Sequence, residues 1–328
     1  MIITKTPLRM SFAGGGSDLK SFYSKFGGAV LSTSINKYIY VSINKKFDQG
    51  IRVAYSVNEE VSKIEDLMHP IVKAALKFMG LEQGIEITTI ADIPSRGTGL
   101  GSSSSFTSGL LNGLHHYLDI PITSNKLADL SCHIEIDLCE EPIGKQDQYA
   151  AVYGGFNLIE FHKNDDVLVT PIKCSEKTKK NIEDNIVIFY TGMNRKSSVI
   201  LSEQTKDMGK KNKQDIVKEM VDLCYILAKD IEEDNISNFG EILHDNWMLK
   251  KKINDSISNT KIDAWYKIAE SSGSIGGKLL GAGAGGFLMF YAKKSNHDDI
   301  IHSLSDLEHI PICFDNTGST VVYDDQKA

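Results

Sequence analysis

The spacing of apolar residues along the first half of the chain predicts strands and helices in alternation. Two segments rich in β-branched residues, 38–44 and 85–91, have the length and composition of strands. Helical spacing of apolar residues marks three further segments, at residues 67–78, 106–118 and 127–138. Shorter alternating segments follow and predict a β-hairpin over 156–162 and 167–172.

A polar stretch at residues 173–184 interrupts this pattern and is the best candidate for a domain junction. We expect a first domain over residues 1–185 and a second over 186–328. The second half begins with an apolar strand at 186–191, and an apolar stripe then marks a long helix over 216–231. The remaining pattern predicts helices near 236–247, 262–269 and 297–307, a strand at 287–291, and short strands after them.

Composition and charge exclude several functional classes. The chain has 328 residues, 41% of them hydrophobic, and a formal net charge of −7, which describes a globular protein. It has no broad basic surface for nucleic acid or anionic membranes, although a local cluster could bind a small anion. The five cysteines form no C-x-x-C pair, which argues against a zinc site. Without a membrane-length apolar segment or a signal peptide, we expect a cytoplasmic protein.

The most informative segment is PSRGTGLGSSSS at residues 94–105, between the predicted strand at 85–91 and the helix at 106–118. Glycines let the backbone approach a ligand, and a helix start offers unpaired N–H groups at the positive end of its dipole. Together they predict a phosphate-binding loop. It is not a P-loop, since G-x-x-x-x-G-K-[ST] does not occur here. The alternative is an exposed linker, but linkers seldom join a strand to an amphipathic helix.

This segment resembles the nucleotide-binding motif of the GHMP kinases, which include galactokinase, homoserine kinase and mevalonate kinase. The resemblance implies an ATP-dependent kinase with a two-domain α+β fold. In that fold an N-terminal mixed sheet with helices is followed by a C-terminal ferredoxin-like α/β sandwich, and the active site lies between them. The residues that it assigns to ATP are Arg96, Gly97, Thr98, Gly99, Gly101, Ser102, Ser103 and Ser104.

Two more motifs of the family follow the expected order. The sequence TPLRMSFAGGGSDL at residues 6–19 resembles the first motif, but its glycine turn lacks the Glu and His of galactokinase-like members, which argues against galactose. The sequence KLLGAGAGGF at residues 278–287 resembles the third motif; because it follows a helical pattern, we do not interpret its glycines as a dinucleotide fingerprint. For both, a structural turn without a ligand is the alternative. The residues that the resemblance assigns to the acceptor are Arg9, Gly14, Gly15, Gly16, Ser17, Asp18, Asp147, Arg195 and Gly283.

The segment between the second and third motifs contains the candidate acids. Ile134 and Leu138 are expected to point to the core, so Glu135 lies on another face of its helix, where a surface carboxylate is the alternative. The resemblance assigns Glu135 and Ser103 to Mg²⁺, which prefers oxygen ligands. It makes Asp147 the general base, with Arg9 or Lys145 keeping the carboxylate ionised. Helix capping is the alternative role of Asp147.

Longer sequence strings indicate one branch of the family. PLRMSFAGGGSDL, EPIGKQDQYAAVYGG and YTGMNRKS resemble bacterial members that phosphorylate D-glycero-D-manno-heptose, or its 7-phosphate, at the anomeric oxygen for nucleotide-activated heptose synthesis. A 7-phosphate would need cations, and the candidates are Lys20, Lys37, Arg195 and Lys196. Another sugar 1-kinase of the fucokinase or galactokinase type, a mevalonate or homoserine kinase, and a non-catalytic ATP and sugar sensor are the alternatives. We expect a monomer or homodimer that binds a sugar or sugar phosphate, but neither nucleic acid nor membrane.

Overall fold

The computed structural model describes residues 1–94, 98–193 and 197–325, and within them the chain forms a nine-stranded sheet and a four-stranded sheet. The larger sheet has the order β13-β1-β2-β5-β3-β4, with β6 and β12 also on β2, and β7 on β6. Its strands are β1 (Ile2–Ala13), β2 (Gly28–Lys45), β3 (Ile51–Ala54), β4 (Asn58–Val61), β5 (Ile85–Ala91), β6 (Phe156–Phe161), β7 (Val167–Pro171), β12 (Phe314–Asp315) and β13 (Thr320–Asp324). Strands β3 and β5 are parallel, so the sheet is mixed.

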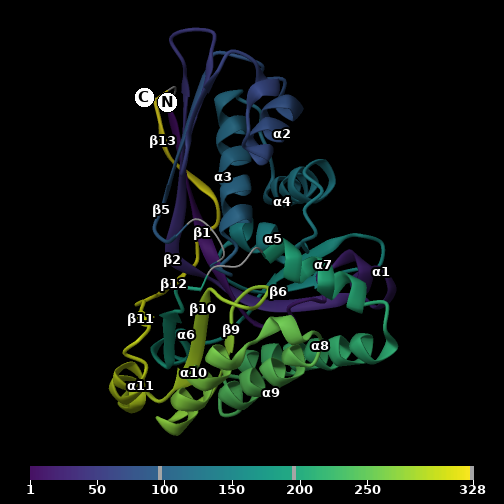
Figure 1. Ribbon diagram of the computed structural model, residues 1–328, viewed down its shortest axis with the longest axis vertical. Helices are drawn as coiled ribbons and strands as arrows, with labels where there is room; N and C mark the ends of the chain where they lie inside the picture. The colour runs from purple at the N-terminus through teal and green to yellow at the C-terminus, as the bar shows by residue number, and fades with distance from the viewer. Residues whose placement is uncertain (95–97, 194–196, 326–328) are drawn as a thin grey trace.

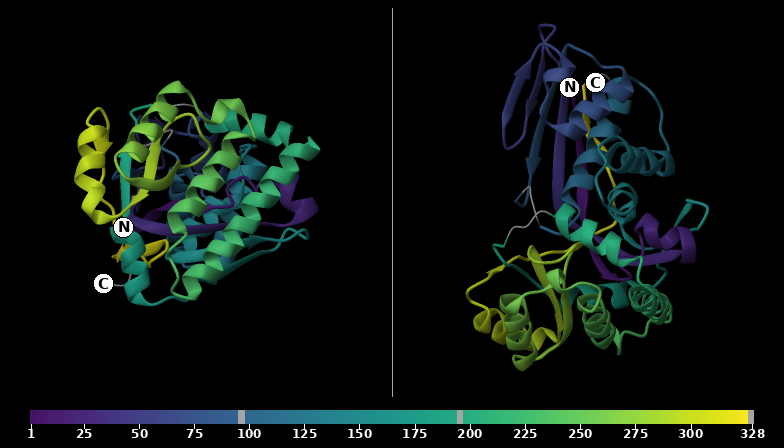
Figure 2. Two further views of the ribbon diagram at one scale, coloured as in Figure 1. Left: turned by 90° about the horizontal axis from the view of Figure 1, so that it is seen from below. Right: turned by 45° about the vertical axis from the view of Figure 1, so that its right-hand side comes forward.

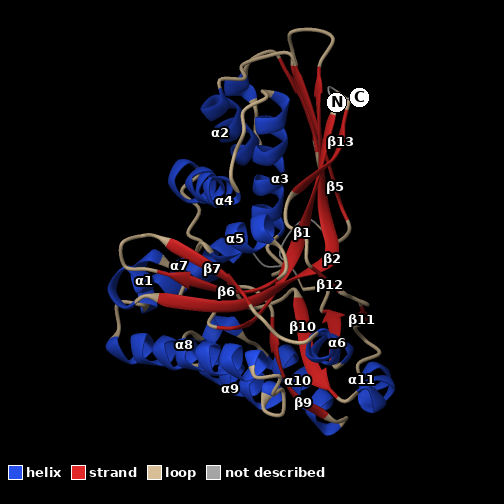
Figure 3. Cartoon of the chain, turned by 180° about the vertical axis from the view of Figure 1, so that it is seen from behind, coloured by secondary structure: helices blue, strands red, loops and turns tan. Residues whose placement is uncertain are grey.

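Three helices cover one face of the larger sheet (Figure 1). They are α2 (Pro70–Met79), α3 (Ser102–Tyr117) and α4 (Ser124–Cys132), and α3 packs directly on β1 and β2. In β1 the first four residues alternate between buried and half-buried, whereas residues 6–13 are buried on both faces. Helices α8 (Lys211–Glu232) and α9 (Phe239–Lys251) cover its second face as β1 and β2 curve toward β6 and β7 (Figure 3).

The smaller sheet is antiparallel and has the order β11-β8-β10-β9. Its strands are β8 (Ile186–Tyr190), β9 (Ser274–Leu279), β10 (Phe287–Ala292) and β11 (Glu308–His309). Helix α9 packs on β9 and β10, and α10 (Thr260–Ser271) packs on β9 and on α11 (His297–Ser303) (Figure 2). This arrangement confirms the predicted α+β fold, with a mixed N-terminal sheet and a C-terminal α/β sandwich.

The other helices are short, and they complete the connections between these layers. They are α1 (Lys20–Phe26), α5 (Gln146–Tyr153), α6 (Glu176–Asp184), α7 (Ser197–Asp207), a π-helix (His133–Leu138) and single 3₁₀ turns at Ile64–Asp66, Asp255–Ile257 and Lys294–Asn296. In the part of the chain that the structure describes, no helix is both long enough and apolar enough to cross a membrane.

The polar stretch that we expect at the domain junction, residues 173–184, contains helix α6. Ser175 caps the helix by accepting a hydrogen bond from the amide of Thr178 at 3.1 Å, and Ile182 is fully buried. Burial of one face therefore stabilises this helix, although the composition of the segment is as polar as that of a linker. The domain boundary at residue 185 stays a prediction; β8 begins at Ile186, while β12 and β13 return to the larger sheet.

The two sheets share a hydrophobic core, and Phe12 at the end of β1 lies at their junction. Its ring centroid is 5.4 Å from that of Phe156 on β6 and 5.3 Å from that of Phe239 on α9, in both cases edge to face. A third ring, that of Phe314, lies 6.3 Å away. The Phe12 side chain therefore connects the first strand to both halves of the molecule.

We expect Phe12→Ala to lower the free energy of unfolding by ~3–5 kcal/mol, because it removes a fully buried ring and leaves a cavity between the sheets. Urea unfolding followed by circular dichroism measures this change. The control is Phe47→Ala, which truncates a fully exposed ring and should change stability by less than ~0.5 kcal/mol. Equal midpoints for the two variants would contradict the assigned role of Phe12.

Candidate active site

The predicted phosphate-binding segment ends at the first turn of α3. Gly101 is the N-cap residue, with a φ of +77° that favours glycine, and no side chain caps the helix. The first N–H groups of α3 are thus left for an anion. Thr98 and Ser102 hydrogen-bond to each other through their hydroxyls at 3.0 Å. Arg96 and Gly97, assigned to ATP from the sequence, lie outside the described residues.

Arg9 on β1, which is buried, and Asp147 in the first turn of α5, which is partly exposed, form an ion pair beside that helix start. Both Nε and Nη2 of Arg9 lie 2.7 Å from Asp147 Oδ1, and Nη1 donates to the carbonyl of Gly99 at 2.6 Å. A Cβ built on Gly101 would lie 3.4 Å from Asp147 Oδ2, so the carboxylate lies against the start of α3. The N-cap residue of α5 is Lys145 and not Asp147, and no side-chain capping bond is formed there.

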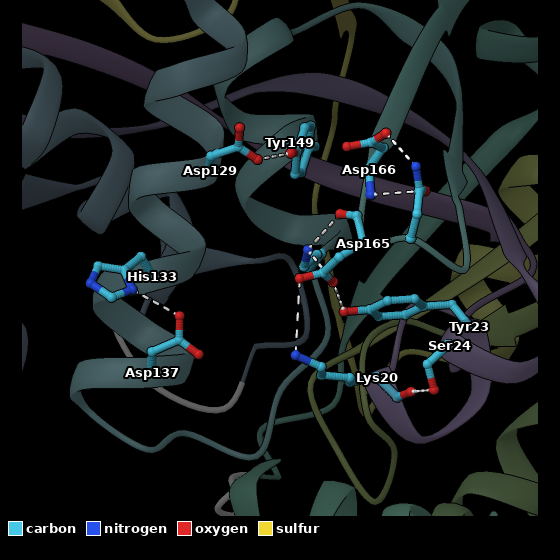
Figure 4. Close-up of polar contacts among 11 residues, drawn as sticks. Lys20, Tyr23, Ser24, Asp129, His133, Asp137, Tyr149, Asp165 and Asp166 are labelled. Carbon is cyan, nitrogen blue, oxygen red and sulfur yellow. Dashed lines mark hydrogen bonds and ion pairs between the residues drawn. The ribbon is translucent and has the colours of Figure 1, made fainter.

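Lys145, the other cation predicted beside Asp147, points elsewhere. Its Nζ lies 2.8 Å from Oδ1 of Asp165, whose carboxylate also accepts a 2.6 Å hydrogen bond from Tyr23 (Figure 4). These residues line a cavity of about 550 Å³ next to Asp18, together with Lys20 and residues of α4 and the π-helix. Arg9 is therefore the residue that pairs with Asp147, and Lys145 belongs to the adjoining cavity.

Glu135 reaches the same region because the chain forms a π-helix at residues 133–138. The amide of Cys139 donates to the carbonyl of Ile134, five residues earlier, at 3.0 Å. The wider turn changes which side chains face inward. Glu135 becomes fully buried, whereas Leu138, expected in the core, is 47% exposed.

The buried Glu135 carboxylate contacts the predicted phosphate-binding helix. Its Oε1 accepts from the Ser103 hydroxyl at 2.6 Å, and its Oε2 accepts from Gln148 Nε2 at 2.7 Å. Burial raises the pKa of Glu135, and the nearby Asp147 carboxylate adds to this effect. A bound cation would favour the ionised form.

The residues at this position fit a magnesium ion carried by a nucleotide. Glu135 and Ser103 present oxygen atoms, and the buried Oε1 of Gln148 lacks a hydrogen-bond partner. Among the described residues, no group of three or more His, Cys, Asp or Glu side chains could hold a metal without other ligands. That composition suits Mg²⁺, which usually takes one or two carboxylates and completes its shell with phosphate oxygens and water.

The glycine turn of the first motif is constrained by close backbone packing. A Cβ on Gly14, whose φ is +84°, would lie 1.9 Å from the carbonyl oxygen of Ala29. The Ser17 hydroxyl donates to that carbonyl at 3.0 Å. Asp18 is buried and accepts hydrogen bonds from the amide of Gly16 at 3.0 Å and from Gln146. Burial, with a smaller effect from Asp147, raises the pKa of Asp18.

The third motif forms the loop between β9 and β10, so it follows a strand and not the helix that we expected. A Cβ on Gly99 would lie 2.3 Å from the carbonyl oxygen of Leu280, and one on Gly281 would lie 2.4 Å from the Cα of Gly99. The second and third motifs therefore pack backbone to backbone. Gly283 packs on the backbone of Ile257, and Arg195 lies outside the described residues.

Sequence reasoning missed three buried polar residues beside these motifs. Lys250 of α9 donates to the carbonyl of Gly281, Lys278 of β9 donates to that of Phe12 at 3.1 Å, and Asn246 Oδ1 accepts from the amide of Gly14 at 3.2 Å. Lys250 lies three residues after the buried Trp247, on the apolar face of α9. A polar residue at a core position of the apolar helix stripe was the signal that the sequence offered for such a site. It is easily missed here, because the run Lys250–Lys252 resembles the solvent-exposed end of a helix.

Comparisons with known proteins agree with this geometry. The chain is 29% identical over 315 residues to D-glycero-alpha-D-manno-heptose 7-phosphate kinase of Campylobacter jejuni, a match that covers 92% of this chain and 93% of that protein. It is 26% identical to L-fucokinase/L-fucose-1-P guanylyltransferase of Bacteroides fragilis, over 88% of this chain but 34% of that longer protein. A crystal structure of a D-glycero-D-manno-heptose 1-phosphate kinase from Bacteroides thetaiotaomicron superposes with a TM-score of 0.80 and 25% identity, covering 99% of this chain and 100% of that one.

Two matches to domain families cover the second and third of the predicted motifs. Residues 67–155, which contain the phosphate-binding segment and both candidate acids, match the GHMP kinases N terminal domain. Residues 227–308, which contain the third motif and Lys250, match the GHMP kinases C terminal domain. The order of the motifs, the fold and both domain matches agree, and the chain belongs to the GHMP kinase family.

Proposed function

We propose that this protein is an ATP-dependent sugar kinase that phosphorylates the anomeric hydroxyl of D-glycero-D-manno-heptose 7-phosphate, or of the free heptose, in the cytoplasm. The observation that carries the proposal is the Asp147 carboxylate, held by Arg9 against the uncapped start of α3. Similarity to heptose phosphate kinases over nearly the whole chain supports the choice of acceptor.

The geometry supports direct, in-line transfer. The triphosphate lies on the first amides of α3, and the acceptor hydroxyl approaches Asp147 from the side of the glycine turn. As the sugar oxygen bonds to the γ-phosphorus and the bond to the ADP oxygen breaks, Asp147 accepts the hydroxyl proton. Arg9 keeps Asp147 ionised and oriented. Positioning and charge neutralisation supply most of the acceleration in such a reaction.

Ser103 and Glu135 would hold the magnesium ion of the nucleotide. When bound there, Mg²⁺ supplies positive charge that neutralises the phosphate oxygens. The contribution of the chain is to keep the exposed Ser103 hydroxyl and the buried Glu135 carboxylate together before the nucleotide arrives, 2.6 Å apart.

The cavity beside Asp18 suits the part of the acceptor remote from the reacting hydroxyl. Lys20 and Lys145 supply its ammonium groups, both beside the Asp165 carboxylate. Five aspartates and two asparagines, which can bind hydroxyls, line it together with two tyrosines, Cys132, His133 and aliphatic side chains. Of the cations considered for a 7-phosphate, Lys20 lines this cavity, whereas Arg195 and Lys196 lie outside the described residues. A fucokinase-like acceptor is the second candidate, because a fucokinase is also among the relatives.

We expect Asp147→Asn to lower kcat by ~10²–10⁴-fold, because it removes the proton acceptor. Asparagine keeps an oxygen for Arg9, so the fold and the affinity for ATP should change little. Single-turnover kinetics and ATP titration measure the two effects separately. Unchanged turnover would remove Asp147 from the mechanism.

We expect kcat/KM for heptose 7-phosphate to exceed that for free heptose by ~10-fold or more, since a phosphate pairs with lysine in the cavity. ADP release with a panel of sugars gives the values, and phosphorus NMR locates the new phosphate at C1. Lys20→Met should reduce the preference, while Lys25→Met on the same helix should not. Equal values for the two heptoses would refute the 7-phosphate requirement.

We expect Glu135→Gln to raise the Mg²⁺ concentration needed for half-maximal rate by ~10-fold, because it removes the ligand charge but keeps the side-chain shape. A Mg²⁺ titration at saturating ATP measures this. Glu140→Gln is the matched control, since that carboxylate lies two residues after the π-helix, is exposed and does not line the cavity beside Asp18. The same shift in both variants would show that Glu135 has no specific role.

A further inference from the structure

Lys250 places a buried amino group between the glycine turn of the first motif and the loop of the third motif. The residue is 5% exposed, and its Nζ donates to the carbonyl of Gly281. A Cβ on Gly15, in the middle of the glycine turn, would lie 3.9 Å from this Nζ. Helix α9 therefore delivers a positive charge to the space between the acceptor turn and the third-motif loop.

The amino group of Lys250 is free to bind an anionic ligand, whereas the guanidinium of Arg9 is already paired within the protein. The guanidinium of Arg9 is paired with Asp147, and its Nη1 is bonded to Gly99. In the described part of the chain, no carboxylate oxygen lies within 4.0 Å of the Lys250 Nζ, and its one hydrogen-bond acceptor is Gly281. An ammonium group has three N–H donors, so two of them remain for oxygen atoms of a ligand.

Burying the Lys250 side chain lowers the stability of the folded protein when no ligand is bound. Burial, together with the charge of Arg9, lowers the pKa of Lys250 to about 8 against the opposite effect of Asp18 and Asp147. Lys278 on β9 adds a second buried amino group nearby, and burial lowers the pKa of that group as well. A hydrophobic side chain of similar volume would avoid this penalty, so the position favours anion binding over stability.

We propose that Lys250 is a further catalytic residue, whose ammonium group binds an oxygen of the γ-phosphoryl group as it passes to the acceptor. The inference rests on the proposed function. In the transition state, negative charge is spread over the peripheral oxygens of that group. A positioned cation stabilises this transition state more than it stabilises the bound ground state. Lys250 makes and breaks no covalent bond; Asp147 still takes the proton.

The test compares Lys250→Met with Lys250→Arg and with Lys251→Met, a control on the same helix whose lysine pairs with Asp263. We expect Lys250→Met to lower kcat by ~10²-fold, with KM for the sugar changed less than ~3-fold. Its melting temperature should equal or exceed that of the wild type, and its ADP affinity should be retained. Lys250→Arg should recover at least a tenth of the turnover, and Lys251→Met should keep all of it.

The pH dependence of kcat/KM gives an independent test of the role of Lys250. The groups that face Lys250 are Arg9, Asp18, Asp147 and Lys278. If the ammonium form is required, kcat/KM of the wild type falls as pH rises through about 8, and Lys250→Arg moves that limb upward by more than one pH unit.

Three outcomes would overturn the inference: a Lys250→Met variant with unchanged kcat, a loss confined to KM, or a variant with a lower melting temperature and no rescue by arginine. The wild-type assay separates this failure from failure of the proposed function. If the wild type phosphorylates no heptose or heptose phosphate, the acceptor assignment is wrong. If it does so and Lys250→Met matches it, only the role of Lys250 is wrong.

Discussion

A single buried guanidinium joins three segments that lie far apart in the sequence. Arg9 comes from the first strand, its Nε and Nη2 hold Asp147 at the start of α5, and its Nη1 holds the carbonyl of Gly99 ahead of α3. The backbone amide of Arg9 also donates to the carbonyl of Leu100 at 3.0 Å. Because the guanidinium is planar, these bonds fix the direction as well as the distance between the segments. A lysine could supply the charge but not this geometry.

The charged groups around Arg9 are those that water would normally solvate. Asp18, Glu135 and Lys250 are all buried, and each has its pKa moved toward the neutral form chiefly by burial. Such a concentration of perturbed groups is typical of functional sites. Here the backbone packing of Gly99 on Gly281 leaves little room for solvent between the motifs. The charges therefore act in a medium where they interact strongly.

The sequence predicted the three motifs and the fold class well, because glycine turns and long apolar patterns are local signals. It placed Arg9 beside Asp147 and Ser103 beside Glu135, and the structure has both contacts, but it did not predict the contacts of Lys250, Lys278 and Asn246 with the motifs. The π-helix turned Leu138 outward, since a helical period of 3.6 residues does not hold across a wider turn. Residues 173–184 look like a linker, since only Thr178 and Ile182 are buried in α6. The burial of Lys250 could not be predicted, because it depends on β9 and the third-motif loop, which are distant in the chain.

The pairing of β13 with β1 has a consequence for how the chain acquires its structure during synthesis. Strand β13 forms the edge of the larger sheet beside Ile2–Lys5, at a separation of more than 300 residues. The sheet that carries Arg9 thus stays incomplete while the smaller sheet is being made. Until residues 320–324 leave the ribosome, the outer edge of β1 exposes unpaired backbone groups, the kind of edge on which nascent chains associate. Strand β1 is in this way fully paired only after β13, which is translated more than 300 residues later, has formed.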